Sequence, residues 1–435
     1  MTTPDRTVPP RVYDIPTLTR PVAERFTLAN GIDVVMLNCG DRELTRVTLV
    51  ANGGLVEAPV RGAAVIMPDL AREGTASMTG SEIADALEFS GAECRSICHT
   101  HHNSTSLVGP TSKVEAMLPV LTDIVARPSF PSETLAPIAD RAAAKIELQL
   151  KRVEFLASRE LNKLLYGAGH PAARFSSPEN IRMTSREDIV EWHRLMTNPA
   201  SMTLFVAGRV PDSLLASIEQ NVGNITALGD GVPIDYTPYT PSPSTEPVKV
   251  DRPGALQSAI AAGLTSISRL DDDYIPLRLA VIALGGYFGS RLMLNIREDK
   301  GLTYGISAVL AGGKEGSVMK IATECDNRLV PVVIDEIKRE MRRLQDPSTF
   351  TADEINRMRR YLVSNLAAMV DSPFAVMDTY ENVLYAGTPE DYFERQQQHV
   401  RSFTAESLAE TARRYLDPDN LRIAIAGDLA KIEQK

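Results

Sequence analysis

Residues 62–75 have the sequence GAAVIMPDLAREGT. Small residues at the start, an apolar run in the middle and Gly74-Thr75 at the end predict a short buried helix, because glycine ends a helix at little cost. Pro68 lies within the apolar run, and inside a helix it would remove one backbone hydrogen bond at a cost of about 3 kcal/mol. The helix is therefore predicted from its flanking residues and in spite of its proline.

The composition is that of an ordinary globular protein with ample material for a core. The chain has 435 residues, of which 43% are apolar and 23% charged. Length alone suggests about three domains, a number that the repeat described below revises to two. A formal net charge of −10 disfavours nucleic acid and anionic membranes as partners. No run approaches 18 uninterrupted apolar residues, so we expect no membrane span.

The compartment is predicted from the N-terminus and the cysteines. Residues 1–6 contain no apolar segment of the kind that a signal peptide needs. The four cysteines are scattered and too few for a disulfide framework, which is typical of a reducing environment. We therefore expect a cytoplasmic protein, or a periplasmic one if a leader has been removed.

The two halves of the chain share identities at a constant offset of 219 positions, as Pro199 and Pro418 show. In each half a helical pattern, an Asn-Pro or Asp-Pro break and an apolar strand follow one another in the same order. In-register identities at the ends of such segments indicate an internal duplication. The other matching pairs are Leu165-Tyr166 with Leu384-Tyr385 and Ala207-Gly208 with Ala426-Gly427.

Local patterns predict the elements of the first half. Residues 26–36 predict a hairpin around Asn30-Gly31, since Asn-Gly is the strongest short hairpin signal. We expect a strand at 47–51, an amphipathic helix at 81–87 with Ser81 near its cap, two strands around a histidine-rich turn at 93–108, and helices at 114–125 and 131–166.

The duplication and these elements predict an α+β fold with two homologous lobes, each a mixed β-sheet with helices packed on one face. We divide the chain into an extended arm (1–20), a first domain (21–228), a linker (229–247) and a second domain (248–435). The linker contains five prolines, which predict a stiff, extended connection.

The frame around residues 62–75 resembles the first core helix of the insulinase/pitrilysin-like zinc peptidases, which include the mitochondrial processing peptidases. In that family the frame carries the motif H-x-x-E-H, whose histidines bind zinc and whose glutamate polarises the attacking water. The five motif positions here run from Val65 to Asp69. Val65, Pro68 and Asp69 stand where the first histidine, the glutamate and the second histidine would be, so the resemblance implies no zinc cofactor and no catalytic residue in this chain.

The family's third zinc ligand is a glutamate on the long helix that follows. The resemblance places that position at Ala144 or Lys145, with Glu147 one or two residues out of register. Without the histidines, Glu147 is expected to be a solvated or ion-paired helix residue rather than the remnant of a metal site.

Residues 289–304, GSRLMLNIREDKGLTY, resemble the other part of the family's active site, L-x-x-x-L-R-E-x-x-G-L-x-Y. There the arginine and the tyrosine reach the substrate near the scissile bond, and Arg297 and Tyr304 match them. A guanidinium and a phenol can both donate to peptide carbonyls and to a developing oxyanion. The competing interpretation is structural: Arg297 paired with Glu298 or Asp299 at a helix end, and Tyr304 packed on a strand.

One dense cluster of soft metal ligands remains, formed by Cys94, Cys98, His99, His101 and His102. Zinc requires four groups that converge tetrahedrally, whereas strand alternation would place Cys98 and His99 on opposite faces. A histidine-rich surface turn is therefore favoured over a metal site.

These resemblances together imply a non-catalytic family member, built as a half clamshell. It would pair with a zinc-bearing homologous subunit, or with itself, and supply Arg297 and Tyr304 to one wall of the peptide chamber. The substrate would be an unfolded peptide held against a sheet edge by strand addition. The alternatives are a scaffold or binding protein without a part in proteolysis, and a separate metalloenzyme that uses the Cys94–His102 cluster.

Overall fold

The computed structural model describes residues 7, 16–234 and 236–432, so most of the predicted arm at 1–20 lies outside the described residues. Within them the first lobe contains a six-stranded sheet of order β1-β2-β6-β3-β5-β4, and the second lobe a five-stranded sheet of order β7-β11-β8-β10-β9. The strands are β1 (Glu24–Thr27), β2 (Asp33–Asn38), β3 (Leu44–Asn52), β4 (Glu93–Cys98), β5 (His102–Pro110), β6 (Met202–Gly208), β7 (Val248–Asp251), β8 (Gln257–Ser266), β9 (Thr303–Gly312), β10 (Ser317–Asp326) and β11 (Arg422–Gly427).

Both sheets are mixed, which confirms the predicted α+β class. The β2–β6 and β7–β11 pairs are parallel, while β3, for example, pairs antiparallel with both of its neighbours. The first-lobe helices are α1 (Arg61–Leu70), α2 (Gly80–Ser90), α3 (Thr111–Ala126), α4 (Ser132–Gln149), α5 (Val153–Tyr166), α6 (Pro178–Arg182), α7 (Arg186–Met196) and α8 (Asp212–Asn221).

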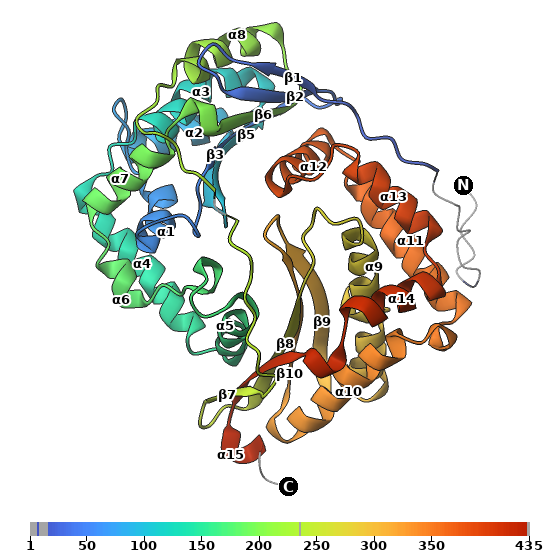
Figure 1. Cartoon of the computed structure of the whole chain (residues 1–435). Helices are drawn as coiled ribbons and strands as arrows, with labels where there is room; N and C mark the ends of the chain where they lie inside the picture. Colours follow the sequence, from blue (N-terminus) through green and yellow to red (C-terminus); the bar gives the residue numbers. More distant parts are fainter. Residues whose placement is uncertain (1–6, 8–15, 235, 433–435) are drawn as a thin grey trace.

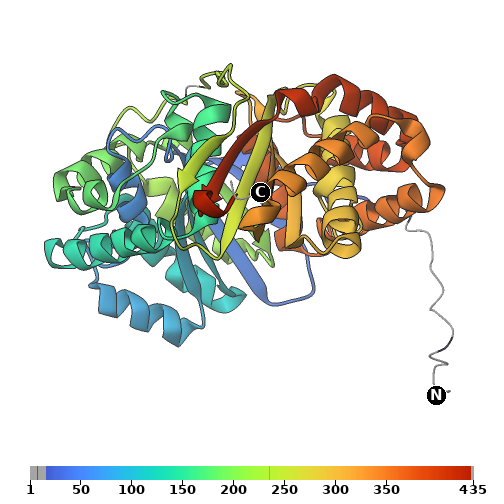
Figure 2. The ribbon, with the colours of Figure 1, turned by 90° about the horizontal axis from the view of Figure 1, so that it is seen from below.

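The second-lobe helices are α9 (Tyr274–Gly285), α10 (Val330–Leu344), α11 (Ala352–Ala368), α12 (Pro373–Ala386), α13 (Tyr392–Ser402), α14 (Ala405–Tyr415) and α15 (Leu429–Ile432). A π-helical segment, η4, spans Met293–Asp299. Short 3-10 turns are η1 (Pro171–Ala173), η2 (Pro199–Ser201), η3 (Val222–Asn224), η5 (Asn327–Leu329), η6 (Pro347–Thr349) and η7 (Pro418–Asn420). Figure 2 shows the helices of the two lobes on opposite sides of the molecule.

The predicted hairpin is present as β1 and β2, which pair antiparallel. Gly31 takes a φ of 93° at its turn, a conformation that residues with a Cβ rarely adopt. The Asn30 amide donates to the backbone carbonyls of Val222 and Ile225, at 2.9 and 3.0 Å. The hairpin is thus fixed to the end of the first lobe.

Two helix boundaries differ from the prediction. The cap of α2 is Thr79 rather than Ser81, and Thr79 forms a reciprocal capping box with Glu82, which satisfies two backbone donors at once. The helix predicted at 131–166 is broken at 150–152 into α4 and α5. The break matters because α5 leaves the helical layer of its own lobe.

One helix of each lobe packs against the sheet of the other lobe (Figure 1). Leu156, Leu161 and Leu165 of α5 pack against small residues of the second sheet, among them Ala261 on β8 and Ala424 on β11. In return, α12 packs on β2 and β6 of the first sheet, on the face turned toward the second lobe (Figure 1).

The contacts of α12 are equally apolar. Val376 and Met377 form one buried cluster with Val35, Leu37 and Phe205 of the first sheet. Each sheet is therefore covered on one face by helices of its own lobe and on the other by a helix of its neighbour, which goes beyond the predicted covering of a single face.

The positions related by the 219-residue offset lie in matching elements. Leu165-Tyr166 and Leu384-Tyr385 stand at the ends of the exchanged helices α5 and α12. Pro199 and Pro418 begin η2 and η7, and the Ala-Gly pairs end β6 and β11. The sequence repeat therefore coincides with a structural one.

The segment 229–247 crosses from the first lobe to the second beside α5, with residue 235 outside the described part. The backbone N–H groups of Thr240 and Ser242 donate to the carbonyls of Tyr166 and Leu164, at 3.1 and 2.8 Å. The linker is therefore hydrogen-bonded to the exchanged helix along part of its length.

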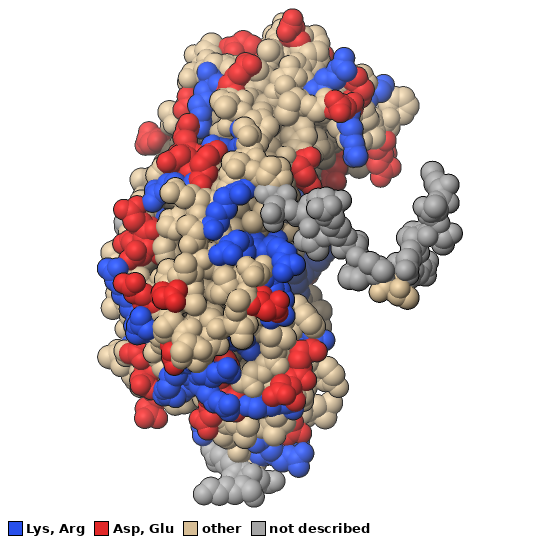
Figure 3. Space-filling model, turned by 90° about the vertical axis from the view of Figure 1, so that its right-hand side faces the viewer, with Lys and Arg blue, Asp and Glu red and all other residues tan. Residues whose placement is uncertain are grey.

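Among the described helices, none is long and apolar enough to cross a membrane. On the face shown in Figure 3, lysine and arginine side chains gather in patches with acidic side chains beside them. This face therefore carries charges of both signs.

Candidate functional site

The residues at the zinc-motif positions have structural contacts. Helix α1 contains Pro68 in its interior, and the proline is buried. Val65 packs against the core of the first lobe, and Asp69 forms a half-exposed ion pair with Arg72 at 3.2 Å. Arg72 also donates to the Cys94 carbonyl on the edge strand β4, at 3.2 Å. The helix is where the resemblance places it, and its motif positions serve packing and surface pairing.

The position proposed for a third zinc ligand has no metal-binding geometry. Glu147 pairs with Arg182 at 2.8 Å, and Arg182 also pairs with Asp140 at 3.0 Å. Glu147 is thus an ion-paired helix residue, as expected. No group of three or more His, Cys, Asp or Glu residues in the described part of the chain is placed to hold a metal ion.

Arg297 lies in the π-helical segment η4 and is partly exposed. Its Nε is 3.5 Å from Glu298 Oε1, with 37% of the arginine side chain exposed. Its guanidinium also lies over the ring of Phe288, 5.2 Å from the centroid. In this state the arginine has the local carboxylate partner that the structural interpretation predicts.

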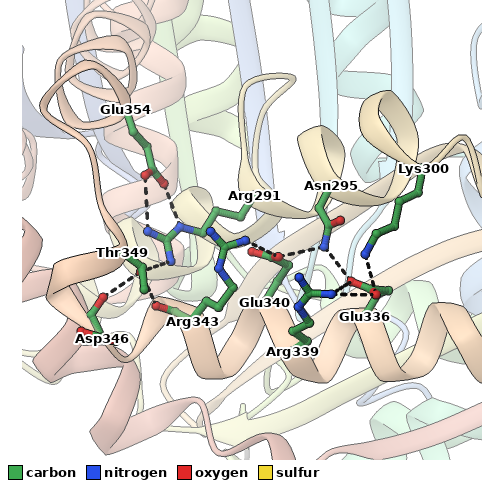
Figure 4. A network of polar contacts seen from close by, with 10 residues as sticks. All are labelled: Arg291, Asn295, Lys300, Glu336, Arg339, Glu340, Arg343, Asp346, Thr349 and Glu354. Atoms are coloured by element: carbon green, nitrogen blue, oxygen red, sulfur yellow. Dashed lines mark hydrogen bonds and ion pairs between the residues drawn. The ribbon is translucent and has the colours of Figure 1, made fainter.

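A buried polar network anchors the segment before Arg297 (Figure 4). Arg291 is 7% exposed and donates to both oxygens of Glu354, at 2.8 and 3.3 Å, and to Thr349 Oγ1 at 3.0 Å. Its guanidinium also lies 3.8 Å from the centroid of the Phe350 ring. These contacts fix the N-terminal side of η4.

The middle and end of η4 are held by helix α10. The Asn295 amide donates to Glu336 at 2.9 Å and to Glu340 at 2.8 Å, and Lys300 pairs with Glu336 at 2.5 Å. Glu340 is 1% exposed and also accepts from Arg343 at 2.8 Å. These contacts fix η4 at both ends and can therefore hold Arg297 in a defined position. Short π-helical segments also occur often at functional sites.

Tyr304 projects from the start of the edge strand β9 and is 90% exposed. It lines a cavity of about 320 Å³ between α5 and the second sheet, together with Glu154, Lys320 and Glu324, and Arg297 lies outside that cavity. The structure therefore brings Tyr304, but not Arg297, to this group of ionisable side chains.

The two carboxyl groups of the cavity have opposite pKa shifts. Burial and the neighbouring Glu154 raise the pKa of Glu324 to about 7. Burial also opposes the charge of Glu154, but hydrogen bonds with Glu324 and Arg152 outweigh it and lower the pKa of Glu154 to about 2. Burial lowers the pKa of Lys320 to about 8, and its ammonium donates to Asn162 at 2.7 Å.

Sequence reasoning missed Glu154, Lys320 and Glu324. They come from α5 and β10, more than 150 positions apart, and no local motif connects them. A signal would have required knowing that α5 covers the sheet of the other lobe.

The histidine-rich turn between β4 and β5 lies between the lobes, so its predicted place on the free surface is wrong. The His102 ring stacks on His99 at 4.4 Å and on Tyr385 of α12 at 3.9 Å between centroids. His101 bridges the lobes, with Nδ1 2.6 Å from Glu57 and Nε2 3.4 Å from Glu315. The turn was misplaced because its partners belong to the second half of the chain.

The histidines of this turn have pKa values shifted in opposite directions. Burial acts against the protonated form of His101, but hydrogen bonds with Glu315 and Glu57 outweigh it and raise the pKa of His101 to about 9. Burial and the neighbouring histidines lower the pKa of His102 to about 3. The turn lines an inter-lobe cavity of about 630 Å³, in which His101 is the charged histidine at neutral pH.

Part of the chain matches a known family model, and several named proteins are similar to it in sequence. Residues 184–362 match the model described as the peptidase M16 inactive domain. A Bacillus subtilis protein named uncharacterized zinc protease YmxG is 20% identical over 303 residues, which are 68% of this chain and 72% of the relative. The human mitochondrial-processing peptidase subunit alpha is 24% identical over 390 residues, 82% of this chain and 73% of the relative.

Comparison with solved structures shows that the fold is also similar to that of peptidase M16 proteins. A crystal structure of a peptidase M16 inactive domain from Pseudomonas fluorescens superposes with a TM-score of 0.85 at 22% identity, over 93% of this chain and 98% of that one. The match to an uncharacterized zinc protease of Mycobacterium leprae, 23% identical over 62% of this chain, spans only 61% of that relative's length. The chain is therefore similar in sequence and fold to the insulinase/pitrilysin-like (peptidase M16) family, and Val65, Pro68 and Asp69 stand at its zinc-motif positions.

Proposed function

We propose that this chain is a zinc-less subunit that binds extended peptides and contributes Arg297 and Tyr304 to proteolysis by a zinc-bearing partner. The observation that carries the proposal is the contrast between the two motif regions. Val65, Pro68 and Asp69 replace both histidines and the glutamate of the motif. In contrast, the segment with Arg297 is anchored by a buried network (Figure 4) and leads directly to the 90% exposed Tyr304. The Arg297 guanidinium and the Tyr304 hydroxyl are hydrogen-bond donors on a fixed segment, which suits them to bind a peptide substrate.

The sheet edge beside Tyr304 offers a place for the peptide. Strand β9 is an edge strand of the second sheet, and an extended peptide can add to such an edge through main-chain hydrogen bonds. The edge strand β4 of the first sheet is less available, since Arg72 already donates to its Cys94 carbonyl. Strand addition at β9 would lay the peptide beside the Tyr304 hydroxyl.

The proposed partner is a homologue with an intact H-x-x-E-H motif, or a second copy of this chain in a complex that gains zinc elsewhere. The relationship to a processing-peptidase subunit alpha supports a subunit role, because the name of that relative describes one component of a peptidase. With a zinc-bearing homologue as the partner, the zinc would reside in that homologue.

The test begins with affinity capture from the source organism and identification of a homologue that carries the motif. The purified chain alone should cleave no peptide, and the reconstituted complex should show chelator-sensitive cleavage. In that complex Tyr304→Phe should lower kcat by about 10²–10³-fold, if its hydroxyl donates to the developing oxyanion. Arg297→Ala should also raise KM, because a charged donor to the bound peptide is lost.

A second candidate is a scaffold without a part in proteolysis. It is favoured by the contacts that Arg297 already makes with Glu298 and Phe288. Full cleavage activity of both variants in an assembled complex would reject the first proposal and favour this one. Gel filtration of each variant serves as the control for assembly.

A further inference from the structure

The second lobe contains a cavity of about 440 Å³, separate from the one at Tyr304. It lies between the loop 267–273, strand β9 and helices α12 and α13. Among the described residues that line it, none is acidic, while Arg269 and Arg278 both face it. In a chain with a net charge of −10, a cavity with two arginines and no carboxylate is an unusual environment.

Among the described residues, no ion pair joins Arg269 or Arg278 to a carboxylate. Arg269 Nε has no hydrogen-bond partner in the described part of the molecule, and its guanidinium lies over the Tyr392 ring, 5.3 Å from the centroid. The nearby carboxylates of Asp272 and Asp273 are taken by Arg395 and Arg414. An arginine that is left without a carboxylate in a lined cavity is free to bind an anion.

Two further polar groups of the cavity lack partners. The Tyr392 hydroxyl and Gln396 Oε1 are buried without a hydrogen bond among the described residues, and their residues are 6% and 4% exposed. Leaving such a group unsatisfied is unfavourable. A bound anion would accept from the Tyr392 hydroxyl, and from Gln396 Nε2 once the amide is turned so that Nε2 takes the place of Oε1.

Apolar side chains also line the cavity, together with the polar residues Tyr274, Thr379 and Asn382. Leu310, Val383 and Phe393 form one side. The loop that carries Arg269 is tied to the β9–β10 turn, because Arg269 N donates to the Gly313 carbonyl at 3.0 Å and Ser268 Oγ to the Lys314 carbonyl at 2.9 Å. The cavity therefore combines polar donors with apolar lining residues, and the backbone of its Arg269 loop is held in place.

The cavity adjoins the inter-lobe cavity, since both are lined by Arg269, Gly312 and Asn382. A ligand can therefore enter from between the lobes. We propose that this cavity binds the carboxylate of a ligand with a small apolar side chain, held by Arg269, Tyr392 and Gln396. A peptide C-terminus and a free organic acid share this chemistry, and the site does not depend on the proposed proteolytic role.

The proposal is tested by isothermal titration calorimetry on the full chain with N-acetyl-L-leucine and its amide. The acid should bind with a Kd of about 1 mM, as expected for a ligand of this size, and the neutral amide should bind at least tenfold more weakly. Arg269→Gln should weaken binding of the acid at least tenfold, because it removes the charged donor. Tyr392→Phe keeps the ring below the guanidinium and should weaken binding several-fold, which provides a second test if Arg269→Gln does not fold.

Arg342→Gln is the matched control, since Arg342 pairs with Asp419 on the surface and the substitution makes the same change in charge. It should bind the acid as the wild type does. A five-residue peptide with a free C-terminus, compared with its amidated form, distinguishes the two ligand sources: tighter binding than N-acetyl-L-leucine supports a chain end, and equal binding supports a free acid. No heat with the acid at 20 mM, on the order of twenty times the expected Kd, would show that the cavity holds only water. Equal binding of acid and amide, unchanged binding by Arg269→Gln, or equal competition by inorganic phosphate would also overturn the assignment.

Discussion

His101 carries a charge between the two lobes that few surface histidines would hold at neutral pH. Its ring lies between Glu57 and Glu315, which come from different lobes, and its pKa is raised to about 9. The charged imidazole therefore joins the first lobe to the second at a turn that also stacks on Tyr385.

The pH dependence of stability follows from this raised pKa. Since the pKa of His101 in the folded chain exceeds the unfolded value near 6.5, its stabilising contribution is fully present below about pH 6.5 and is lost as pH rises through about 9. The wild type should lose about 1–2 kcal/mol more than His101→Gln between pH 6 and pH 9.5, a range that allows for solvent screening of a partly exposed group. Urea denaturation at both pH values measures this difference, and equal losses in the two proteins would contradict the bridge.

Pro68 provides a second test at the scale of one residue. Pro68→Ala restores a helical N–H and removes a ring that disfavours α1, worth about 3 kcal/mol. It also loosens the unfolded chain and enlarges the small cavity that the ring lines, costs of about 1–2 kcal/mol together. The free energy of unfolding should therefore rise by about 1–2 kcal/mol. A clear decrease in the melting temperature would mean that packing of the ring outweighs the helical strain.

At the scale of elements, η4 depends on helix α10. Asn295 satisfies two glutamates with one amide, and the rest of the network ties the same turn to Glu354 and Thr349 (Figure 4). The π-helical segment is therefore held by side chains from outside it.

Asn295→Leu should destabilise the protein by about 1–3 kcal/mol, because Glu340 would lose a donor in a buried position. Asn356→Leu on the exposed side of α11 is the matched control and should change stability by less than about 0.5 kcal/mol. Chemical denaturation followed by circular dichroism measures both. If the two substitutions have the same small effect, the network does not contribute to stability.

The whole molecule is organised by the exchange of α5 and α12 (Figure 1). Each lobe has a core of its own residues, but the other face of each sheet is covered by a helix from the other lobe. We expect the lobes to unfold together.

Leu161→Ala tests this coupling. Leu161 is 1% exposed and belongs to the first lobe by sequence, yet it packs on the second sheet. The substitution should cost about 2–5 kcal/mol. It should also shift the unfolding transition of Trp192 in the first lobe and lower amide protection in β8 and β10 of the second lobe to the same extent.

The exposed Leu148 at the end of α4 supplies the control, since Leu148→Ala removes the same atoms without opening a cavity. Two separate transitions, with only the second-lobe amides affected by Leu161→Ala, would show that the lobes are independent.

The sequence by itself determined the features that are local or repeated. Asn30-Gly31 predicted the first hairpin, the frame of residues 62–75 predicted α1, and the 219-residue offset predicted the duplicated lobes. Turn types and helix ends depend on residues that are neighbours in the sequence, and a duplication appears as a constant offset. The segment 289–304 was likewise recognised from fixed spacings, although the roles of Arg297 and Tyr304 remain predictions.

The tertiary structure decided everything that joins distant residues. Apolar spacing shows that α5 has a buried face, but the same spacing fits either sheet, so the exchange of helices has no signal in a single sequence. The partners of His101, the carboxyl pair of Glu154 and Glu324, and the cavity at Arg269 all depend on that exchange or on the approach of the lobes that it fixes. Their chemistry arises from burial and proximity, which a sequence acquires only when it folds.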